Sequence, residues 1–185
     1  MMEFVYAYAY FVLYAFLGWV CEDLYCGIPA KKFINRGFFY GPYCPIYGVG
    51  ALLVLYPLLF VKDYPILVFV LGVIITSALE YITSWVMEIL FKTRWWDYSE
   101  RFMNINGRVC LLNSTLFGIM SIVVVYIIHP VIQDIVMDIP FTALMSFLSA
   151  FTIGFGIDCV FTVLALLRRK QVFQKVQVQM EAFKK

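Results

Sequence analysis

The sequence has few charged residues, and their placement excludes an ordinary soluble domain. Of 185 residues, 14% are charged and 63% are hydrophobic, against roughly 25% charged and 45 to 50% apolar in a soluble protein. The mean hydropathy is +0.86. The charges fall between long apolar runs and not along one face of each run. This layout predicts a helical bundle embedded in lipid.

Several catalytic signatures are also missing. No Gly-x-x-x-x-Gly-Lys-Ser/Thr motif occurs, so the chain does not bind ATP in the P-loop manner. The single histidine, His129, precedes Pro130 and is predicted to be a loop residue. The five cysteines lack zinc-site spacing, and the basic residues form no stripe that could follow nucleic acid. We therefore predict no metal, no cofactor, no nucleic-acid partner and no assigned catalytic residue, with an enzyme less favoured than a non-enzyme.

Five apolar runs approach the length of a membrane span. They cover residues 4–24, 42–61, 65–91, 109–132 and 140–167. The predicted fold is all-α, a polytopic bundle of five transmembrane helices followed by a basic amphipathic cytoplasmic tail at residues 168–185. The second run is rich in glycine and proline, so four spans plus a re-entrant segment is the alternative topology.

The distribution of basic residues decides between these topologies. With five spans, all but one of the 14 Lys and Arg lie on one face, and the exception is Lys62. Because Lys and Arg in short loops are retained on the cytoplasmic side, we predict that the N-terminus is outside and the C-terminus is cytoplasmic.

Acids inside apolar runs are candidates for function, because an ionised group in hydrocarbon is costly. Glu80 and Asp158 lie near mid-depth of their runs, and Ser84 and Thr162 follow them at i+4. These four residues are predicted either to line a path for a cation, a proton or a polar substrate, or only to hold the bundle together. Small or polar residues recur at the same spacing in three runs, where we expect helices to meet: Tyr6, Tyr10, Tyr14, Gly18 and Glu22; Thr76, Glu80, Ser84 and Glu88; Ser146, Ala150, Gly154, Asp158 and Thr162.

A second set of polar residues lies near the predicted cytoplasmic helix ends. Their shared depth predicts that the two cytoplasmic loops come together in one cluster. The cluster is either a neutral lock of paired charges or a site where an arginine holds an anionic group. Its members are Glu22, Arg36, Glu88, Arg94, Asp97, Asn104, Asn106 and Arg108.

Motifs between residues 35 and 111 resemble those of a bacterial family catalogued as putative ABC-transporter type IV (CmpB-like). The motifs are Asn35-Arg36-Gly37-Phe38, Gly41-Pro42, Pro45-Ile46-Tyr47-Gly48, Glu80-Tyr81, Arg94-Trp95-Trp96-Asp97-Tyr98-Ser99 and Asn106-Gly107-Arg108. The resemblance implies a multi-pass protein of the bacterial inner membrane, in the role of a transporter's permease. Any ATPase would then be a separate chain.

The leading hypothesis is a transport-related, permease-like protein whose intramembrane acids line a polar path. One alternative is a membrane enzyme or binder that acts on an anionic lipid headgroup at the cytoplasmic face. Another is a non-catalytic assembly subunit of a membrane complex. The expected partners are the lipid bilayer and either a second copy of the chain or a separate ATPase or membrane subunit.

Overall fold

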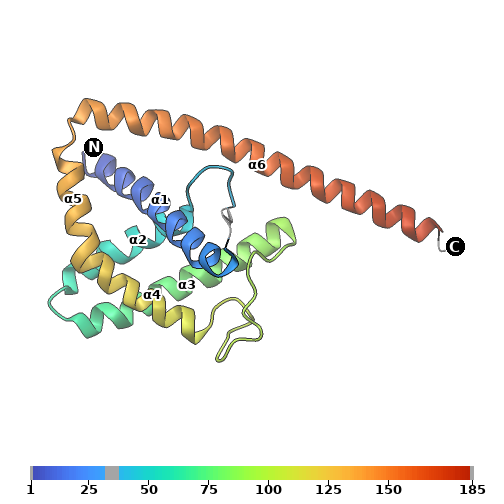
Figure 1. Ribbon diagram of the computed structural model, residues 1–185, viewed down its shortest axis with the longest axis horizontal. Helices are drawn as coiled ribbons and strands as arrows, with labels where there is room; N and C mark the ends of the chain where they lie inside the picture. The colour runs from blue at the N-terminus through green and yellow to red at the C-terminus, as the bar shows by residue number, and fades with distance from the viewer. Residues whose placement is uncertain (1, 32–37, 184–185) are drawn as a thin grey trace.

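The fold is seen in a computed structural model of the chain (Figure 1). The structure describes residues 2–31 and 38–183, with the side chains of all these positions except 26, 29, 30 and 169–183. Helices make up 80% of the chain, and the described part contains no strand. The predicted all-α class is confirmed.

Six α-helices follow one another along the described chain. They are α1 (Met2–Ala30), α2 (Pro45–Leu58), α3 (Pro65–Phe91), α4 (Leu111–Val123), α5 (His129–Asp138) and α6 (Phe141–Phe183). A 3₁₀ turn at Leu59–Val61 extends α2, and a π-helical turn at Val124–Ile128 joins α4 to α5.

Four stretches are long and apolar enough to cross a membrane: Met2–Tyr25, Pro65–Phe91, Leu111–Asp138 and Phe141–Arg168. The chain is therefore a multi-pass membrane protein. The second predicted run forms a shorter apolar helix, Pro45–Val61. Its 17 residues reach about 25 Å at 1.5 Å per residue, slightly less than a hydrocarbon core of about 30 Å.

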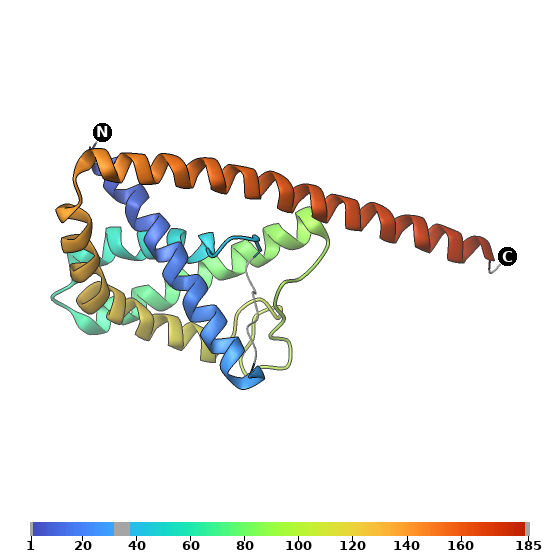
Figure 2. The same cartoon turned by 45° about the horizontal axis from the view of Figure 1, so that its top comes forward.

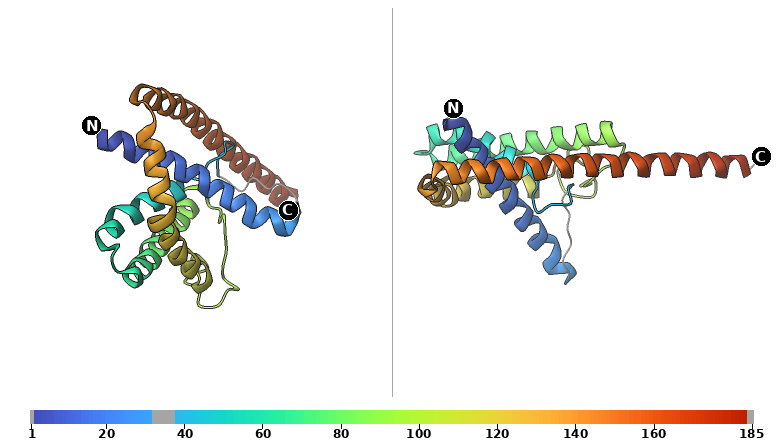
Figure 3. Two further views of the ribbon diagram at one scale, coloured as in Figure 1. Left: turned by 60° about the vertical axis from the view of Figure 1, so that its left-hand side comes forward. Right: turned by 90° about the horizontal axis from the view of Figure 1, so that it is seen from above.

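The helices alternate in direction. Figures 1 and 2 show the N-terminus, the α2–α3 turn and the α5–α6 turn on one side of the molecule. The end of α1, the loop after α3 and the C-terminus lie on the other side, and the view from above in Figure 3 agrees. The shorter helix α2 thus runs back across the same layer as the long helices.

One sequence prediction is wrong at the join between α4 and α5. His129 is not a loop residue but is buried in a continuous helix, where its Nδ1 lies 3.2 Å from the Tyr14 hydroxyl. Pro130 lacks an N–H and its ring crowds the preceding helical turn. The π-helical turn, in which the His129 N–H donates to the Val124 carbonyl, accommodates this proline. The helix therefore continues past the predicted end at residue 132, to Asp138.

Small residues bring two helix pairs close together. A methyl group placed on Gly72 of α3 would lie 2.6 Å from Ser121 of α4, and one placed on Gly48 of α2 would lie 2.6 Å from the Phe11 carbonyl oxygen of α1. Gly18, on the predicted α1 strip, packs against Tyr47 in the same way. Gly154, on the α6 strip, meets no atom within 4 Å. Helix α6 therefore packs loosely along its span, of which only 6% is buried.

Candidate functional site

Glu80 is buried in the interior of the bundle. It lies on α3 with 7% of its surface exposed. The Tyr98 hydroxyl donates to its Oε1 over 3.1 Å, whereas its Oε2 is buried and has no hydrogen-bond partner among the described residues. Glu80 therefore faces the interior of the bundle. Its carboxyl group retains an acceptor that no side chain satisfies.

The loop between α3 and α4 positions Tyr98. The Tyr98 N–H donates to the Gly107 carbonyl over 2.8 Å, and the indole N–H of Trp96 donates to the Arg108 carbonyl over 3.0 Å. Gly107 has a φ of 68°, a conformation that only glycine adopts readily. The hairpin formed by these bonds turns the Tyr98 ring inward, and burial, together with the Glu80 charge, raises the pKa of its phenol.

The end of α1 adds two carboxyl groups to this region. The Tyr47 hydroxyl donates to Glu22 Oε1 over 2.8 Å, and Glu22 lies close enough to Glu80 for like charges on the two carboxyl groups to repel each other. Asp23 is 8% exposed, and within the described part of the chain neither of its carboxyl oxygens has a hydrogen-bond partner. We call Glu22, Asp23 and Glu80 the interior acids.

Asp23 is the functional candidate that the sequence reasoning missed. It adjoins Glu22 near the end of an apolar run, and neighbouring helical residues face different directions. The run of α1 continues as helix to Ala30, so the acids lie a full turn or more before its end. Two adjacent acids so placed are a usable signal, although the sequence does not tell which one is buried.

Glu88 is the centre of a charged cluster at the end of α3. Its Oε2 accepts from Arg94 Nε at 3.0 Å and from Arg108 Nη2 at 2.7 Å. Arg108 Nη1 also donates to the Ser84 hydroxyl over 3.3 Å. A single carboxylate oxygen of Glu88 therefore accepts hydrogen bonds from two guanidinium groups. The described bond of the Ser84 hydroxyl is to Arg108 and not to Glu80.

The remaining loop candidates build the hairpin itself. Asp97 accepts hydrogen bonds from the backbone and side chain of Ser99, and these bonds lower the pKa of its carboxyl group. Asn104 Oδ1 accepts from the Gly107 N–H at 3.0 Å, and Asn106 Nδ2 donates to the Tyr81 hydroxyl over 2.9 Å. Their observed contacts are those of loop architecture. Arg36 lies outside the described residues.

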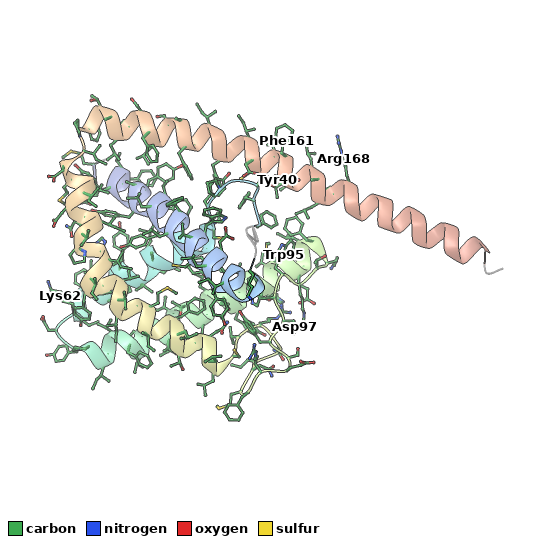
Figure 4. All side chains as sticks on the ribbon, viewed as in Figure 1. Tyr40, Lys62, Trp95, Asp97, Phe161 and Arg168 are labelled. Atoms are coloured by element: carbon green, nitrogen blue, oxygen red, sulfur yellow. The ribbon has the colours of Figure 1, made fainter. Side chains whose placement is uncertain are left out.

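Asp158 is in a different environment. It accepts from the Tyr40 N–H at 3.2 Å, the Gly41 N–H at 2.7 Å, the Thr162 hydroxyl at 2.9 Å and the Tyr43 hydroxyl. The donors other than Thr162 belong to the irregular segment that precedes α2, so this segment is fastened to α6. Figure 4 shows Tyr40 beside α6, the helix to which the labelled residues Phe161 and Arg168 belong.

The structure therefore separates the predicted site residues into three groups. Glu22 and Glu80 lie near each other in the interior, Glu88 joins Arg94, Asp97 and the buried Arg108 at the end of α3, and Asp158 joins Thr162 under the segment before α2. A hollow of about 500 Å³ borders Asp158, and one of about 300 Å³ borders Glu88, but Glu80 lines neither. No three His, Cys, Asp or Glu side chains within the described ranges are placed to hold a metal ion.

Comparison with known proteins identifies the family. The family model described as "Putative ABC-transporter type IV" matches residues 9–163. The chain belongs to this family. The match covers most of the helical bundle, including Glu22, Glu80, Arg108 and Asp158, and the resemblance seen in the loop motifs is confirmed. No curated protein and no solved structure matches the chain. Membership in the ABC-transporter type IV family and the apolar helices together indicate a transport-related membrane protein.

Proposed function

We propose that this member of the ABC-transporter type IV family is a permease-like protein in which Glu80 and Glu22 bind and exchange a proton or a cation. The observation that carries the proposal is the Glu80 Oε2 atom, which is buried without a donor in a region that also holds the Glu22 charge. A buried carboxylate without a counter-charge is costly, and two nearby carboxylates disfavour each other's ionised form. A bound proton or cation removes both penalties.

The surroundings of Glu80 support a positive ligand. No ion pair is described for Glu80 or Asp23 in the part of the chain that the structure covers, since the ion pairs there involve Glu88 and Asp97. The described donors to Glu22 and Glu80 include the phenols Tyr47 and Tyr98. Phenol oxygens and carboxylates are hard ligands suited to a proton or to a hard cation.

Asp158 and Thr162 are left out of this path in our proposal. Four donors satisfy Asp158, and hydrogen bonds to the charged form of a carboxyl group favour that form. We assign to this pair the structural role of holding the segment before α2 against α6.

The proposed orientation has five spans, with the N-terminus outside and the C-terminus cytoplasmic. The alternating helix directions support it (Figure 2), as does the concentration of basic residues on one side. Single cysteines in place of Asp63 and Arg101, in a background without native cysteines, test it. An impermeant thiol reagent added to whole cells should label the Asp63 position and leave the Arg101 position unmodified. The reverse pattern would refute the orientation.

The family and the lack of a P-loop motif further suggest a separate ATPase partner. The ion-binding proposal is testable without that partner. Purified protein in a weakly buffered detergent solution is mixed with Na⁺, K⁺, Mg²⁺ or Ca²⁺, and proton release is followed with a pH-sensitive dye. We expect release with at least one cation, since a cation that takes the place of a proton displaces it.

The matched variants are Glu80→Gln, which removes the interior carboxyl group, and Glu100→Gln, which makes the same change at an exposed loop position. We expect Glu80→Gln to abolish proton release and Glu100→Gln to preserve it. Unchanged release from Glu80→Gln would contradict the proposal, and so would the absence of release from the unmodified chain with all four cations.

A further inference from the structure

The second hollow, of about 300 Å³, lies at the end of α3 and combines charge with apolar surface. Its walls are Trp85, Glu88, Ile89, Lys92 and Arg108. Lys92 ends the helix in a left-handed conformation, with a φ of 55°, and its N–H donates to the Glu88 carbonyl over 2.8 Å. The residue that terminates the span thus places a cation at the rim of the hollow.

The hollow has an excess of positive charge. Arg108 is 8% exposed, and its Nε is buried without a hydrogen-bond partner. It shares the Glu88 Oε2 atom with Arg94, which also pairs with Asp97 at 3.9 Å, so the charges of the two guanidinium groups are balanced by two carboxylates. Lys92 adds a further charge, and no ion pair is described for it within the described chain. Arg108 also lies over the Tyr81 ring at 5.6 Å, which holds the guanidinium in place.

The other wall is apolar and faces outward. Trp85 and Ile89 lie one turn apart on α3 and are 50% and 47% exposed, and Ile82, three residues before Trp85, is 54% exposed. Because α3 is long and apolar enough to cross a membrane, these exposed side chains are suited to contact with acyl chains. An anionic phospholipid has apolar acyl chains attached to a negatively charged headgroup. A strip of lipid-facing apolar side chains that ends at two cations can therefore match both parts of such a lipid.

We propose that this hollow binds an anionic phospholipid, with the headgroup phosphate on Lys92 and Arg108 and one acyl chain along Trp85 and Ile89. Basic pockets at the ends of membrane helices bind such headgroups, and the guanidinium group suits phosphate geometry. The site is separate from the interior acids and does not depend on their function. The apolar wall favours a lipid over a free anion.

Native mass spectrometry of the purified protein tests the proposal, with phosphatidylglycerol and phosphatidylcholine added at equal concentration. We expect phosphatidylglycerol to bind more tightly. Lys92→Gln should weaken its binding about fivefold, given the contribution of one basic residue near a membrane surface. Lys62→Gln, at the opposite end of the bundle, should leave its binding unchanged. Trp85→Ala should weaken both lipids if the acyl chain lies where we place it.

Equal binding of the two lipids would overturn the proposal, as would equal effects of Lys92→Gln and Lys62→Gln. Inorganic phosphate provides a further arm of the test. If phosphate at millimolar concentration displaces phosphatidylglycerol completely and Trp85→Ala has no effect, the hollow is a simple anion site and the lipid proposal is wrong. Folding of each variant is checked by its melting temperature before lipid is added.

Discussion

Glu80 and Asp158 are both acids within apolar helices, yet they accept different numbers of hydrogen bonds. Asp158 accepts hydrogen bonds from two backbone N–H groups and two hydroxyls. Glu80 accepts one, from Tyr98, and its second oxygen has none. Their depths in the sequence pattern are similar, so depth alone does not separate a structural acid from a functional candidate. The number of donors that reach the carboxyl group separates them.

The source of the donors explains this difference. Asp158 faces the irregular segment before α2, where Tyr40 and Gly41 have backbone N–H groups free to donate. Glu80 meets the α3–α4 hairpin through the Tyr98 side chain, and the backbone groups of its own helix are already bonded within α3. Only a side chain can reach it, and the structure supplies the single hydroxyl of Tyr98. The irregular segment before α2 thus supplies three of the donors to Asp158, whereas a single described donor reaches Glu80.

The largest effect on stability is expected from Asp158→Asn. Hydrogen bonds to a charged group contribute about 1.5–3 kcal/mol each. The Tyr40 and Gly41 N–H groups bond to different carboxylate oxygens, so the asparagine amide would turn a donor toward one of them. We expect a loss of about 3 kcal/mol, measured by thermal or denaturant unfolding in detergent. Thr162→Val removes only one donor and should cost about 1 kcal/mol. If Asp158→Asn is as stable as the unmodified chain, Asp158 is not the structural acid of the pair.

Gly107→Ala tests the hairpin that brings Tyr98 to Glu80. A methyl group at this position would lie 2.4 Å from the Ser99 hydroxyl and 2.5 Å from Asp97 Oδ1, at a φ of 68°. The strain of such a conformation is about 1–3 kcal/mol. We expect a destabilisation of about 2 kcal/mol and increased protease cleavage between residues 92 and 110. Gly156→Ala, at a position with no atom within 4 Å, is the control and should change little.

Arg108 and Arg94 both contact Glu88, but only Arg108 is buried. Lysine has one charged nitrogen and cannot reach both Ser84 and Glu88 as the guanidinium does. Arg108→Lys is therefore expected to cost about 1.5 kcal/mol, and Arg94→Lys less than about 0.5 kcal/mol. Equal losses would show that burial does not distinguish the two arginines.

Tyr98→Phe removes the only described donor to Glu80. Of these tests of the comparison between Glu80 and Asp158, it is among those with the smallest expected effect on stability. The lost hydrogen bond contributes about 0.5–1.5 kcal/mol, so the expected change in stability is about 1 kcal/mol. If Glu80 exchanges a proton or cation, the variant should also shift the cation concentration at which protons are released. Tyr43→Phe, at the Asp158 site, should change stability by a similar amount and leave proton release unchanged.

Much of the fold could be predicted from the sequence, because span length and charge are local properties. The third run, residues 65–91, coincides with α3, since Pro65 starts the helix and Lys92 ends it. The start of α2 at Pro45 could not be placed, because the preceding residues are held by a contact across 118 positions, from Tyr40 to Asp158. The burial of Asp23 likewise depends on tertiary packing. The continuation of the helix through Pro130 depends on a π-helical turn that no local propensity indicates.

The central claim is that Glu80, and not Asp158, holds the exchangeable proton or cation. Infrared difference spectroscopy at neutral pH, in buffer without added metal ions, tests it through the absorption of protonated carboxyl groups. The account predicts that the difference spectrum between the unmodified chain and Glu80→Gln contains a protonated carboxyl band. Adding the cation that releases protons in the dye assay to the unmodified chain should remove this band. The difference with Asp158→Asn should contain none. A protonated carboxyl band that belongs to Asp158, or its absence from the Glu80→Gln difference, would contradict the account.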